Sequence, residues 1–542
     1  MKPINGYNKL RGGYYTPAKI TEFIIDWAIR SCNDTVLEPS CGDGSFLEAI
    51  EKKLSEMECP LDDIFKNVTG IELDEIEARK AAEYNAHVIN EDFFTYYDKE
   101  IEEKTQFDII VGNPPFIRYQ NFDEEYRKTA FKLMEKKGFH PNRLTNIWLP
   151  FLALSCKALT PNGRIGMVIP AELFQVDYAA EIRQFLSSYF DSLTLITFKS
   201  LVFDDIQQEV ILLLGERISL NKGIKLVELD GLQDLINKGI SCLDSVELKT
   251  LDHSKEKWVK YYLSNEEIEL LARLNSDPRI SNAQELFEVN VGLVSGENAF
   301  FILNEDVVEE YNLYNSVVPI ISRSEQLKGI VLSDNDFDNL KNIGKKVFFF
   351  SPGDVSLQKL DKYAKRYIKW GESQGFNENY KCRIRKKWYH VSQSWYADAF
   401  LIRQANLNPK MVINQAGTLV TDTLHKVRFS PKVNGNAVAA AFLNTYTFAL
   451  SETLGRSYGG GVLTFEPGEM RKMRIPMVLA NELDFNKIDE MQREGNIKEI
   501  LDYTDEILLH RGLGLTKYEI LLLHDIWDRM RNRRLSRKKS IQ

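Results

Sequence analysis

The chain has 542 residues, enough for two or three domains that each bury a core of their own. Its 44% hydrophobic and 27% charged residues are typical of a globular protein, and no apolar run approaches the roughly 18 residues of a membrane span. The net charge of −9 is unevenly divided, because residues 1–220 carry 24 Lys+Arg against 35 Asp+Glu, whereas the remainder carries 45 against 43. The C-terminal part is therefore the better candidate for contact with a polyanion.

The six cysteines are scattered over the chain, and none forms a Cys-x-x-Cys pair. This spacing indicates neither a zinc site nor a disulfide framework. The polar residues 1–11 lack the apolar core of a signal peptide. We therefore expect a reduced, cytoplasmic protein without a metal site and without membrane contact.

A turn at residues 12–17 precedes the first predicted helix, residues 18–30, whose apolar residues recur at helical spacing. Thr16 is suited to cap this helix, with Pro17 at its first position. Such capping is compatible with a second role, in which the Thr16 hydroxyl contacts a ligand.

Residues 35–39, 40–45 and 46–54 then predict a strand, a glycine-bearing turn and a helix, the opening unit of a Rossmann-like fold. The Gly-x-Gly turn differs from the dinucleotide fingerprint and lacks the P-loop lysine. Further strands are predicted over residues 68–73 and 87–93. Each of the three strands carries an acid at or near its end, at Glu38, Glu72 and Asp92. Any one of them is compatible with a solvated loop carboxylate, but their regular recurrence favours a binding edge, with Glu72 placed to accept hydrogen bonds from ribose hydroxyls.

A fourth buried strand is predicted over residues 107–111, and Gly112 ends it. The loop that follows, Asn113-Pro114-Pro115-Phe116, is stiffened by two prolines, offers carbonyl and amide acceptors, and ends in a flat apolar ring. These groups are suited to a planar ring bearing an amino group, such as adenine. The alternative is a rigid turn without a ligand.

In their order, these motifs resemble those of S-adenosylmethionine-dependent DNA adenine-N6 methyltransferases of the gamma motif order (TaqI type), over residues 10–215. The resemblance implies that residues 14–17 contact the methionine part of S-adenosylmethionine, that residues 38–44 form the cofactor loop, and that Phe116 replaces the more usual tyrosine. The implied cofactor-binding residues are Thr16, Glu38, Pro39, Ser40, Cys41, Gly42, Gly44, Glu72, Asp92, Phe93 and Pro115, and the implied catalytic residues are Asn113, Pro114 and Phe116.

A helix over residues 146–159 and strands over residues 163–170 and 209–214 extend the same pattern. Between them, residues 201–206 resemble the family segment whose aromatic side chain packs against the flipped base, which makes Phe203 a candidate, together with Tyr119. A buried core phenylalanine is the alternative explanation for Phe203.

Beyond residue 220, two segments (292–300 and 454–461) resemble recurring parts of the family's target-recognition domain. Between them, residues 359–389 hold ten Lys+Arg against three acids, interleaved with seven aromatic residues. Positive charge with aromatic rings suits phosphate contacts and base stacking, and a solvated basic face is the alternative. The candidate DNA contacts are Arg383, Arg385, Lys386 and Lys387, with Gly459 and Gly460 in a hairpin that lets the backbone approach DNA.

The sequence thus predicts an α/β protein with a Rossmann-like class I methyltransferase core (1–220), a mixed α/β target-recognition domain (221–485) and a helical C-terminal extension with a basic tail (486–542). We expect a monomer that binds double-stranded DNA in the cleft between domains and methylates adenine, with any restriction endonuclease on a separate chain. The alternatives are methylation of cytosine N4 or of a protein glutamine, and a catalytically silent DNA-binding specificity protein.

Overall fold

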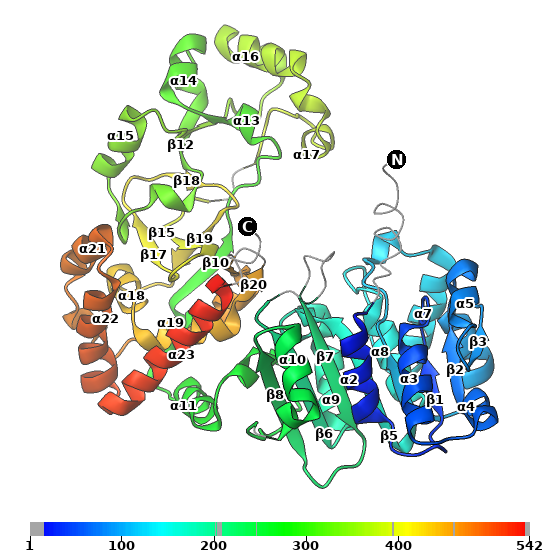
Figure 1. The fold of residues 1–542 in the computed structure, drawn as a ribbon. Helices are drawn as coiled ribbons and strands as arrows, with labels where there is room; N and C mark the ends of the chain where they lie inside the picture. Colours follow the sequence, from blue (N-terminus) through cyan, green and yellow to red (C-terminus); the bar gives the residue numbers. More distant parts are fainter. Residues whose placement is uncertain are drawn as a thin grey trace. The chain divides into compact units, whose positions relative to one another are not determined.

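A computed structural model describes most of the chain, and its contacts divide it into two compact units, one up to Asn265 and one from Glu266 (Figure 1). The predicted contacts Phe203, Gly459 and Gly460, and the side chain of Tyr119, lie outside the described residues. The described residues are 16–200, 202, 209–244, 246–392, 395–458 and 461–536.

The first unit is built on an eight-stranded sheet in the order β3-β2-β1-β4-β5-β7-β6-β8. Its strands are parallel except β7, which runs antiparallel to β5 and β6. This arrangement confirms the predicted Rossmann-like core, because each apolar run that was predicted to be a strand forms a strand of this sheet. The strands are β1 (Val36–Glu38), β2 (Val68–Ile71), β3 (His87–Ile89), β4 (Phe107–Gly112), β5 (Leu159–Pro170), β6 (Ser192–Phe198), β7 (Val210–Glu216) and β8 (Gly223–Leu229).

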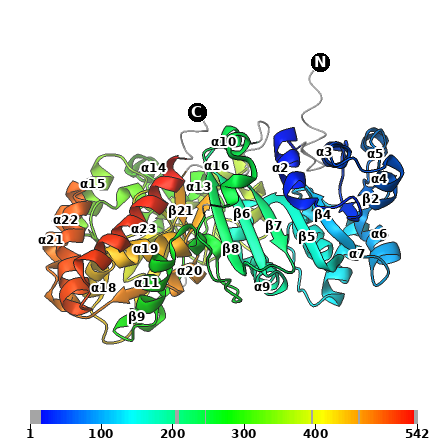
Figure 2. The same cartoon turned by 60° about the horizontal axis from the view of Figure 1, so that its bottom comes forward.

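Helices cover both faces of this sheet (Figure 2). On one face, α2 and α3 pack together and bury apolar side chains such as Ile20, Ile24 and Phe46. The helices α2, α3 and α8 lie where the sequence predicts them. The bounds are α2 (Ala18–Ala28), α3 (Ser45–Glu56), α4 (Leu61–Asn67), α5 (Glu75–Ala81), α6 (Phe93–Tyr96), α7 (Glu124–Lys136), α8 (Trp148–Lys157), α9 (Ala180–Tyr189) and α10 (Leu232–Lys238).

The division between the units differs from the boundary expected at residue 220. That position precedes β8, which pairs in parallel with β6 from Ser192↔Gly223 to Phe198↔Leu229. Pairing with β8 satisfies the backbone groups of β6 that would otherwise lie at an open sheet edge. The first unit therefore extends to Asn265.

Two of the cysteines form a disulfide, which corrects the expectation from their spacing. Cys32 follows α2 and Cys59 follows α3, and their Cα atoms lie 5.5 Å apart. The packing of α2 against α3 brings together residues that lie 27 positions apart in the chain. Because helix packing brings this pair together, the spacing of the cysteines along the sequence does not predict the disulfide.

The second unit combines several small sheets with helices. A five-stranded sheet has the order β10-β19-β15-β17-β13, and a four-stranded sheet has the order β11-β14-β12-β18. The strands are β9 (Ile280–Asn282), β10 (Phe287–Val291), β11 (Ile302–Leu303), β12 (Val317–Ile321), β13 (Val331–Leu332), β14 (Phe348–Phe350), β15 (Ala399–Ile402), β16 (Gln404–Ala405), β17 (Met411–Asn414), β18 (Leu419–Val420), β19 (Leu424–Phe429), β20 (Arg456–Tyr458), β21 (Val462–Thr464) and β22 (Arg474–Pro476).

Most aromatic residues between 359 and 389 form a core rather than a stacking surface. Phe300 lies at its centre and stacks on Tyr367 of α16 (Lys362–Ser373), with ring centroids 4.9 Å apart. Trp370 and Trp388 pack against the same cluster, and Tyr389 is buried in it. Tyr363 and Tyr380 lie outside this cluster, and Tyr380 is 69% exposed. The interleaving of lysines with aromatics thus reflects helix faces, with charged residues outside and rings inside.

The expected C-terminal extension packs as part of the second unit. Within it, α23 (Lys517–Ser536) lies along α19 (Thr445–Leu454), as Figure 1 shows. Arg534, a residue of the predicted basic tail, is only 2% exposed and donates to both carboxylate oxygens of Glu452 and to the Gly461 carbonyl. The charge of Arg534 therefore stabilises the fold through buried contacts. Within the described ranges, no helix is long and apolar enough to cross a membrane.

Candidate functional site

The first unit contains a pocket of about 490 Å³ at the carboxyl ends of its parallel strands. Glu38 ends β1, Glu72 follows β2, and Asn113 follows β4 directly. The parallel pairing of β1 with β2 and β4 sets these strand ends side by side. Ligands bind at this edge in open α/β sheets.

Most residues predicted to hold a cofactor line this single pocket, whereas Gly44, Pro114 and Phe116 do not contribute to its lining. Phe116 is half-buried and packs against the core between α2, α3 and the sheet. The predicted residues that line the pocket are Thr16, Glu38, Pro39, Ser40, Cys41, Gly42, Glu72, Asp92, Phe93, Asn113 and Pro115.

Glu38 is 2% exposed, and its Oε2 atom has no hydrogen-bond partner among the described residues. Burial, followed by the charges of Glu72 and Asp43, raises the pKa of Glu38 well above its usual value. A buried carboxylate oxygen without a donor is costly in the folded protein alone. Its position in the pocket lining indicates that a donor group of a ligand would meet it there.

Glu72 organises the glycine-bearing loop. Its Oε2 accepts from the backbone N–H of Gly42 at 2.9 Å, and its Oε1 accepts from the backbone N–H of Asp74 at 2.8 Å. Burial raises the pKa of Glu72, although these two hydrogen bonds oppose the rise. Each carboxylate oxygen has two lone pairs, so these bonds still leave acceptor capacity for ligand hydroxyls.

Asp92 and Phe93 line the pocket and also stabilise the local structure. Oδ1 of Asp92 caps α6 by accepting from the backbone N–H of Thr95 at 2.9 Å and from its hydroxyl at 3.0 Å. Burial raises the pKa of Asp92. The ring of Phe93 stacks on Phe151 with centroids 5.0 Å apart, and both rings line the pocket.

The two loop glycines meet different demands. Gly42 has φ +53°, and a Cβ atom there would meet nothing within 4 Å, so the left-handed backbone rather than packing explains the glycine. Gly44 has φ +94°, and its Cβ would lie 2.7 Å from the Tyr84 ring. Gly44 therefore allows the start of α3 to pack closely against the Tyr84 ring, and it lies outside the pocket lining.

Thr16 contacts the loop that was predicted to be catalytic. The side-chain nitrogen of Asn113 donates to the Thr16 hydroxyl at 3.1 Å, while Pro17 occupies the N-cap of α2 without a side-chain cap. The expected capping by Thr16 is thus not observed. With Nδ2 directed at Thr16, the acceptor that Asn113 can offer a substrate is its Oδ1.

The pocket is strongly acidic, a feature that only partly follows from the predicted residues. Five further acids line it, and of the residues described along its wall none is basic. Such a wall favours a cationic ligand. Each of these acids lies within a few residues of a strand end or helix start, a signal that the sequence already carried. The additional acids are Asp43, Asp74, Glu77, Glu91 and Asp123.

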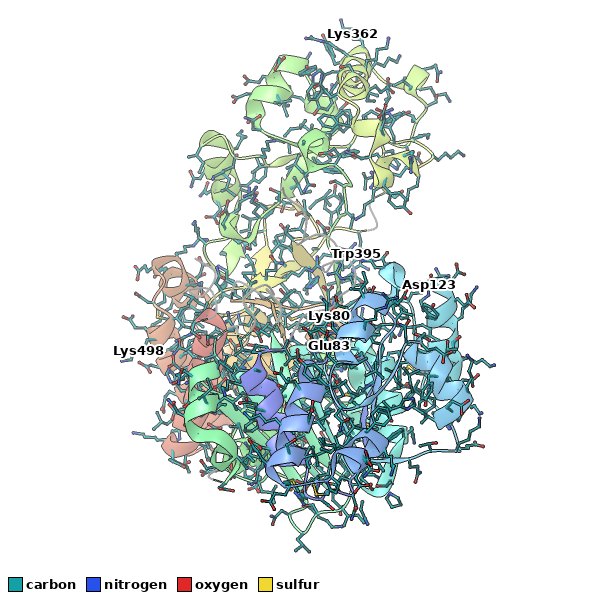
Figure 3. The ribbon with its side chains drawn as sticks, turned by 45° about the vertical axis from the view of Figure 1, so that its right-hand side comes forward. Lys80, Glu83, Asp123, Lys362, Trp395 and Lys498 are labelled. Carbon is teal, nitrogen blue, oxygen red and sulfur yellow. A yellow bond between two sulfur atoms is a disulfide. The ribbon has the colours of Figure 1, made fainter. Side chains whose placement is uncertain are left out.

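A further part of the pocket lining was not predicted from the sequence. Asn121, Phe122 and Tyr126 line the pocket at the start of α7, whose first turn is capped by Asp123 (Figure 3). They follow the Asn-Pro-Pro-Phe loop within ten residues, but this stretch has no distinctive spacing. Only the return of the chain across the sheet edge brings these side chains to the pocket.

These groups match the chemistry of S-adenosylmethionine, the cofactor that the sequence resemblance implies. Its ammonium and sulfonium charges suit the acidic wall, its ribose diol suits Glu72, and its adenine suits the aromatic side of the pocket. The orphaned Oε2 of Glu38 and the open space beside Gly42 fit such a ligand. Burial, followed by the charges of Glu38 and Glu72, raises the pKa of the Cys41 thiol, which disfavours its thiolate form.

The four basic residues proposed as DNA contacts separate into two pairs. Arg385 donates to the carbonyls of Ser295 at 2.6 Å and Val294 at 2.9 Å, and Lys387 pairs with Asp354 at 2.6 Å. Arg383 and Lys386 are exposed. The first pair therefore holds loops of the second unit, and only the second pair is fully presented to solvent.

Two protein-family profiles match the chain, one in each unit. "Eco57I restriction-modification methylase" matches residues 23–203, and "Type II methyltransferase M.Eco57I, C-terminal domain" matches residues 255–509. The type II methyltransferase M.AccI of Acinetobacter calcoaceticus is 25% identical over 526 residues, which cover 91% of this chain and 92% of that protein. M.HindII of Haemophilus influenzae is 24% identical over 412 residues, covering 72% and 71%.

Solved structures share the fold at low sequence identity. The type IIL restriction-modification enzyme MmeI, determined in complex with DNA, superposes with a TM-score of 0.54 at 11% identity over 95% of this chain and 75% of that chain. A DrdV–DNA complex gives a TM-score of 0.50 at 12% identity, covering 90% and 58%. At these identities the likeness concerns the fold alone.

Proposed function

We propose that this chain, whose two units match profiles of type II restriction-modification methyltransferases, is a member of that family and transfers a methyl group from S-adenosylmethionine to N6 of an adenine in double-stranded DNA. The observation that carries the proposal is the convergence of Glu38, Glu72, Asp92 and the Asn113 loop on one acidic pocket. The second unit would recognise the target sequence, and the adenine would leave the base stack, at a cost of a few kcal/mol.

The amide of Asn113 would act on the target amino group. Its Oδ1 and the Pro114 carbonyl would accept the two N6 hydrogens, which draws the nitrogen lone pair out of conjugation with the ring. The Thr16 hydroxyl holds the Asn113 amide in the orientation that presents Oδ1. Phe116 packs against the core outside the pocket lining, and the part of its ring that the core leaves exposed would stack on the base.

S-adenosylmethionine supplies an electrophilic methyl group attached to a positively charged sulfur. The residues Glu38, Glu72 and Asp92 would hold its ammonium group, its ribose hydroxyls and its adenine amino group. With the Asn113 loop orienting the target amine, the nitrogen would gain the methyl group as the sulfur–methyl bond breaks, and the extra N6 proton would leave to solvent. Orientation of the two reactants and charge placement supply most of the acceleration.

The deciding experiment is mass analysis of nucleosides from DNA methylated by the purified chain. N6-methyladenine from the wild type, and none from Asn113→Ala, is the expected result. Asn113→Ala should bind S-adenosylmethionine within about tenfold of the wild type, because the Asn113 amide acts on the target amine. N4-methylcytosine, or methyl transfer to protein alone, would overturn the adenine assignment, and turnover by Asn113→Ala would overturn the role of the loop.

A further inference from the structure

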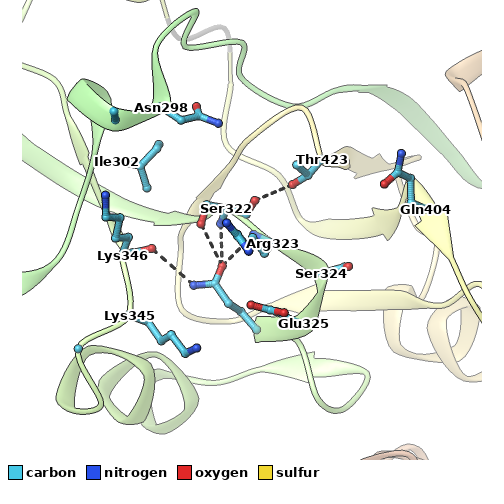
Figure 4. A pocket seen from close by; sticks show the side chains of 13 residues that line it. Asn298, Ile302, Ser322, Arg323, Ser324, Glu325, Lys345, Lys346, Gln404 and Thr423 are labelled. Atoms are coloured by element: carbon cyan, nitrogen blue, oxygen red, sulfur yellow. Dashed lines mark hydrogen bonds between the residues drawn. The ribbon is translucent and has the colours of Figure 1, made fainter. Parts of the chain in front are cut away.

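A second hollow, of about 700 Å³, lies in the second unit where β12 and β18 end and β14 begins (Figure 4). Three cations line it. Arg323 follows β12, and Lys345 and Lys346 precede β14. All three side chains are exposed, and none has an ion-pair partner within the described part of the chain. Glu325 is the one acid among the described lining residues, so the hollow is net positive.

The backbone beneath the cations is held rigidly. Gln326 is 6% exposed, and its Oε1 accepts from the backbone N–H groups of Ser322 at 2.8 Å and Arg323 at 2.9 Å. Its Nε2 reaches the Lys346 carbonyl at 3.5 Å, and the Thr423 hydroxyl donates to the Ser322 carbonyl at 2.7 Å (Figure 4). One buried amide thus ties both cation-bearing segments together, an organisation that reduces the entropy cost of binding a ligand.

Uncharged hydrogen-bonding groups share the hollow with the cations. Gln404 of β16 and Thr423 line it and are exposed. A glutamine amide can pair with the N6 and N7 edge of adenine, and a hydroxyl can pair with several base edges. Cations on an organised backbone, beside a side-chain amide, are a combination by which a protein holds a phosphate backbone and reads one base.

We propose that this hollow binds the DNA substrate, with Arg323, Lys345 and Lys346 contacting phosphates and Gln404 reading a base edge. This inference rests on the proposed function, because it assigns the DNA-recognition role of the second unit to named residues. It adds a contact surface to the exposed pair Arg383 and Lys386. Phosphate contacts set affinity and its salt dependence, whereas the base contact sets sequence choice.

The first test neutralises the cations in the full-length protein. Arg323→Gln/Lys345→Gln/Lys346→Gln should weaken binding to a mixed-sequence duplex at least tenfold at low salt. It should also reduce the slope of log affinity against log salt by about two to three, at about 0.9 for each phosphate that the variant no longer neutralises. The matched control is Lys487→Gln/Lys498→Gln/Lys517→Gln, which removes three exposed charges elsewhere in the unit (Lys498 in Figure 3) and should change neither quantity. Thermal unfolding and S-adenosylmethionine affinity should stay at wild-type values.

The second test maps methylated sites by modification-detecting sequencing in a host that expresses only this chain. Gln404→Ala should relax the choice of base at one position of the recognised sequence by about tenfold, without a change in mixed-sequence affinity. An unchanged salt slope in the triple variant would overturn the proposal while leaving methylation intact. The proposal would also be overturned if the triple variant bound DNA like the wild type but no longer bound a labelled nucleoside triphosphate. That result would make the hollow a nucleotide site. Failure of the proposed function is distinguishable, because the wild type itself would then leave DNA unmethylated.

Discussion

The side-chain nitrogen of Asn113 donates to the hydroxyl of Thr16, 97 residues earlier, at 3.1 Å. This bond joins the turn before α2 to the loop after β4, and in the proposed function it would help to present the Oδ1 end of the Asn113 amide to the substrate. Because an amide presents a donor at one end and an acceptor at the other, its rotation would replace the required acceptor by a donor.

The first prediction follows from this bond. Thr16→Val should lower the single-turnover rate of methyl transfer by about tenfold or more, since the amide loses the group that orients it. Thr16→Ser keeps the hydroxyl and should stay close to the wild type. Rapid-quench kinetics at saturating cofactor separates this effect from any change in cofactor affinity. Equal rates in Thr16→Val and the wild type would show that Asn113 is oriented by other groups.

The second prediction concerns Glu72 and the cofactor. Glu72→Ala should weaken S-adenosylmethionine binding by roughly 1–3 kcal/mol, the cost of a ribose diol without its acceptor. Glu72 also holds the backbone N–H groups of Gly42 and Asp74, so calorimetric binding should be measured beside thermal unfolding. Glu72→Gln retains one side-chain acceptor and should fall between the two. Unchanged affinity in Glu72→Ala would make Glu72 solely a support for the loop.

The third prediction separates the two pairs of basic residues near residue 385. Arg383→Gln/Lys386→Gln should flatten the salt dependence of DNA binding by up to about 1.8 and leave the unfolding temperature unchanged. Arg385→Gln should instead lower stability, because the carbonyls of Val294 and Ser295 lose their donor. Both variants should be measured for salt-dependent DNA binding and for thermal unfolding. If the two variants behaved alike, the division into DNA-contacting and structural residues would be wrong.

The fourth prediction is a pH dependence of stability located at Asp505. Burial raises the pKa of Asp505 to about 7, although its hydrogen bonds from Thr445 oppose the rise. The folded protein therefore holds this proton more tightly than the unfolded chain. Its contribution to stability is full below the unfolded pKa of about 4 and is lost as the pH rises through about 7.

Asp505→Asn keeps an acceptor for the Thr445 backbone N–H, which bonds Oδ1 at 2.9 Å. It should raise the unfolding temperature more at about pH 8 than at about pH 5, because the cost of ionising a buried carboxyl disappears. Glu499→Gln, at an exposed position of the same helix, is the control. Parallel pH profiles for the wild type and Asp505→Asn would mean that Asp505 does not titrate in this range.

The part of the site that could be predicted depends on residues that are neighbours in the sequence. The apolar runs that became β1, β2, β3 and β4 end at or just before Glu38, Glu72, Asp92 and Asn113, and parallel strands place such ends at one edge. The order of these acids before the Asn-Pro-Pro-Phe loop therefore indicated both a pocket and the class of its ligand.

Composition was a poorer guide to the second unit. The stretch 359–389 combines lysines with aromatics, and the sequence could not say which side chains face solvent. In the structure Tyr367 and Tyr389 are buried, and Arg385 bonds to backbone carbonyls. Burial depends on which distant segment covers a residue, and Phe300, the ring that covers Tyr367, is 67 positions away.

The sequence by itself determined the strands β1 to β5 and β7, the acids at the strand ends and the loop that begins at Asn113. These follow from hydrophobic periodicity and turn chemistry, which act over a few neighbouring residues. Only the tertiary structure decided that Thr16 bonds Asn113, that Cys32 meets Cys59, and that Gln326 fixes the backbone beneath Arg323 and Lys346. The Thr16 and Cys32 contacts join segments far apart in the chain, and they arise from the packing of helices and loops around the sheet, which local spacing does not encode.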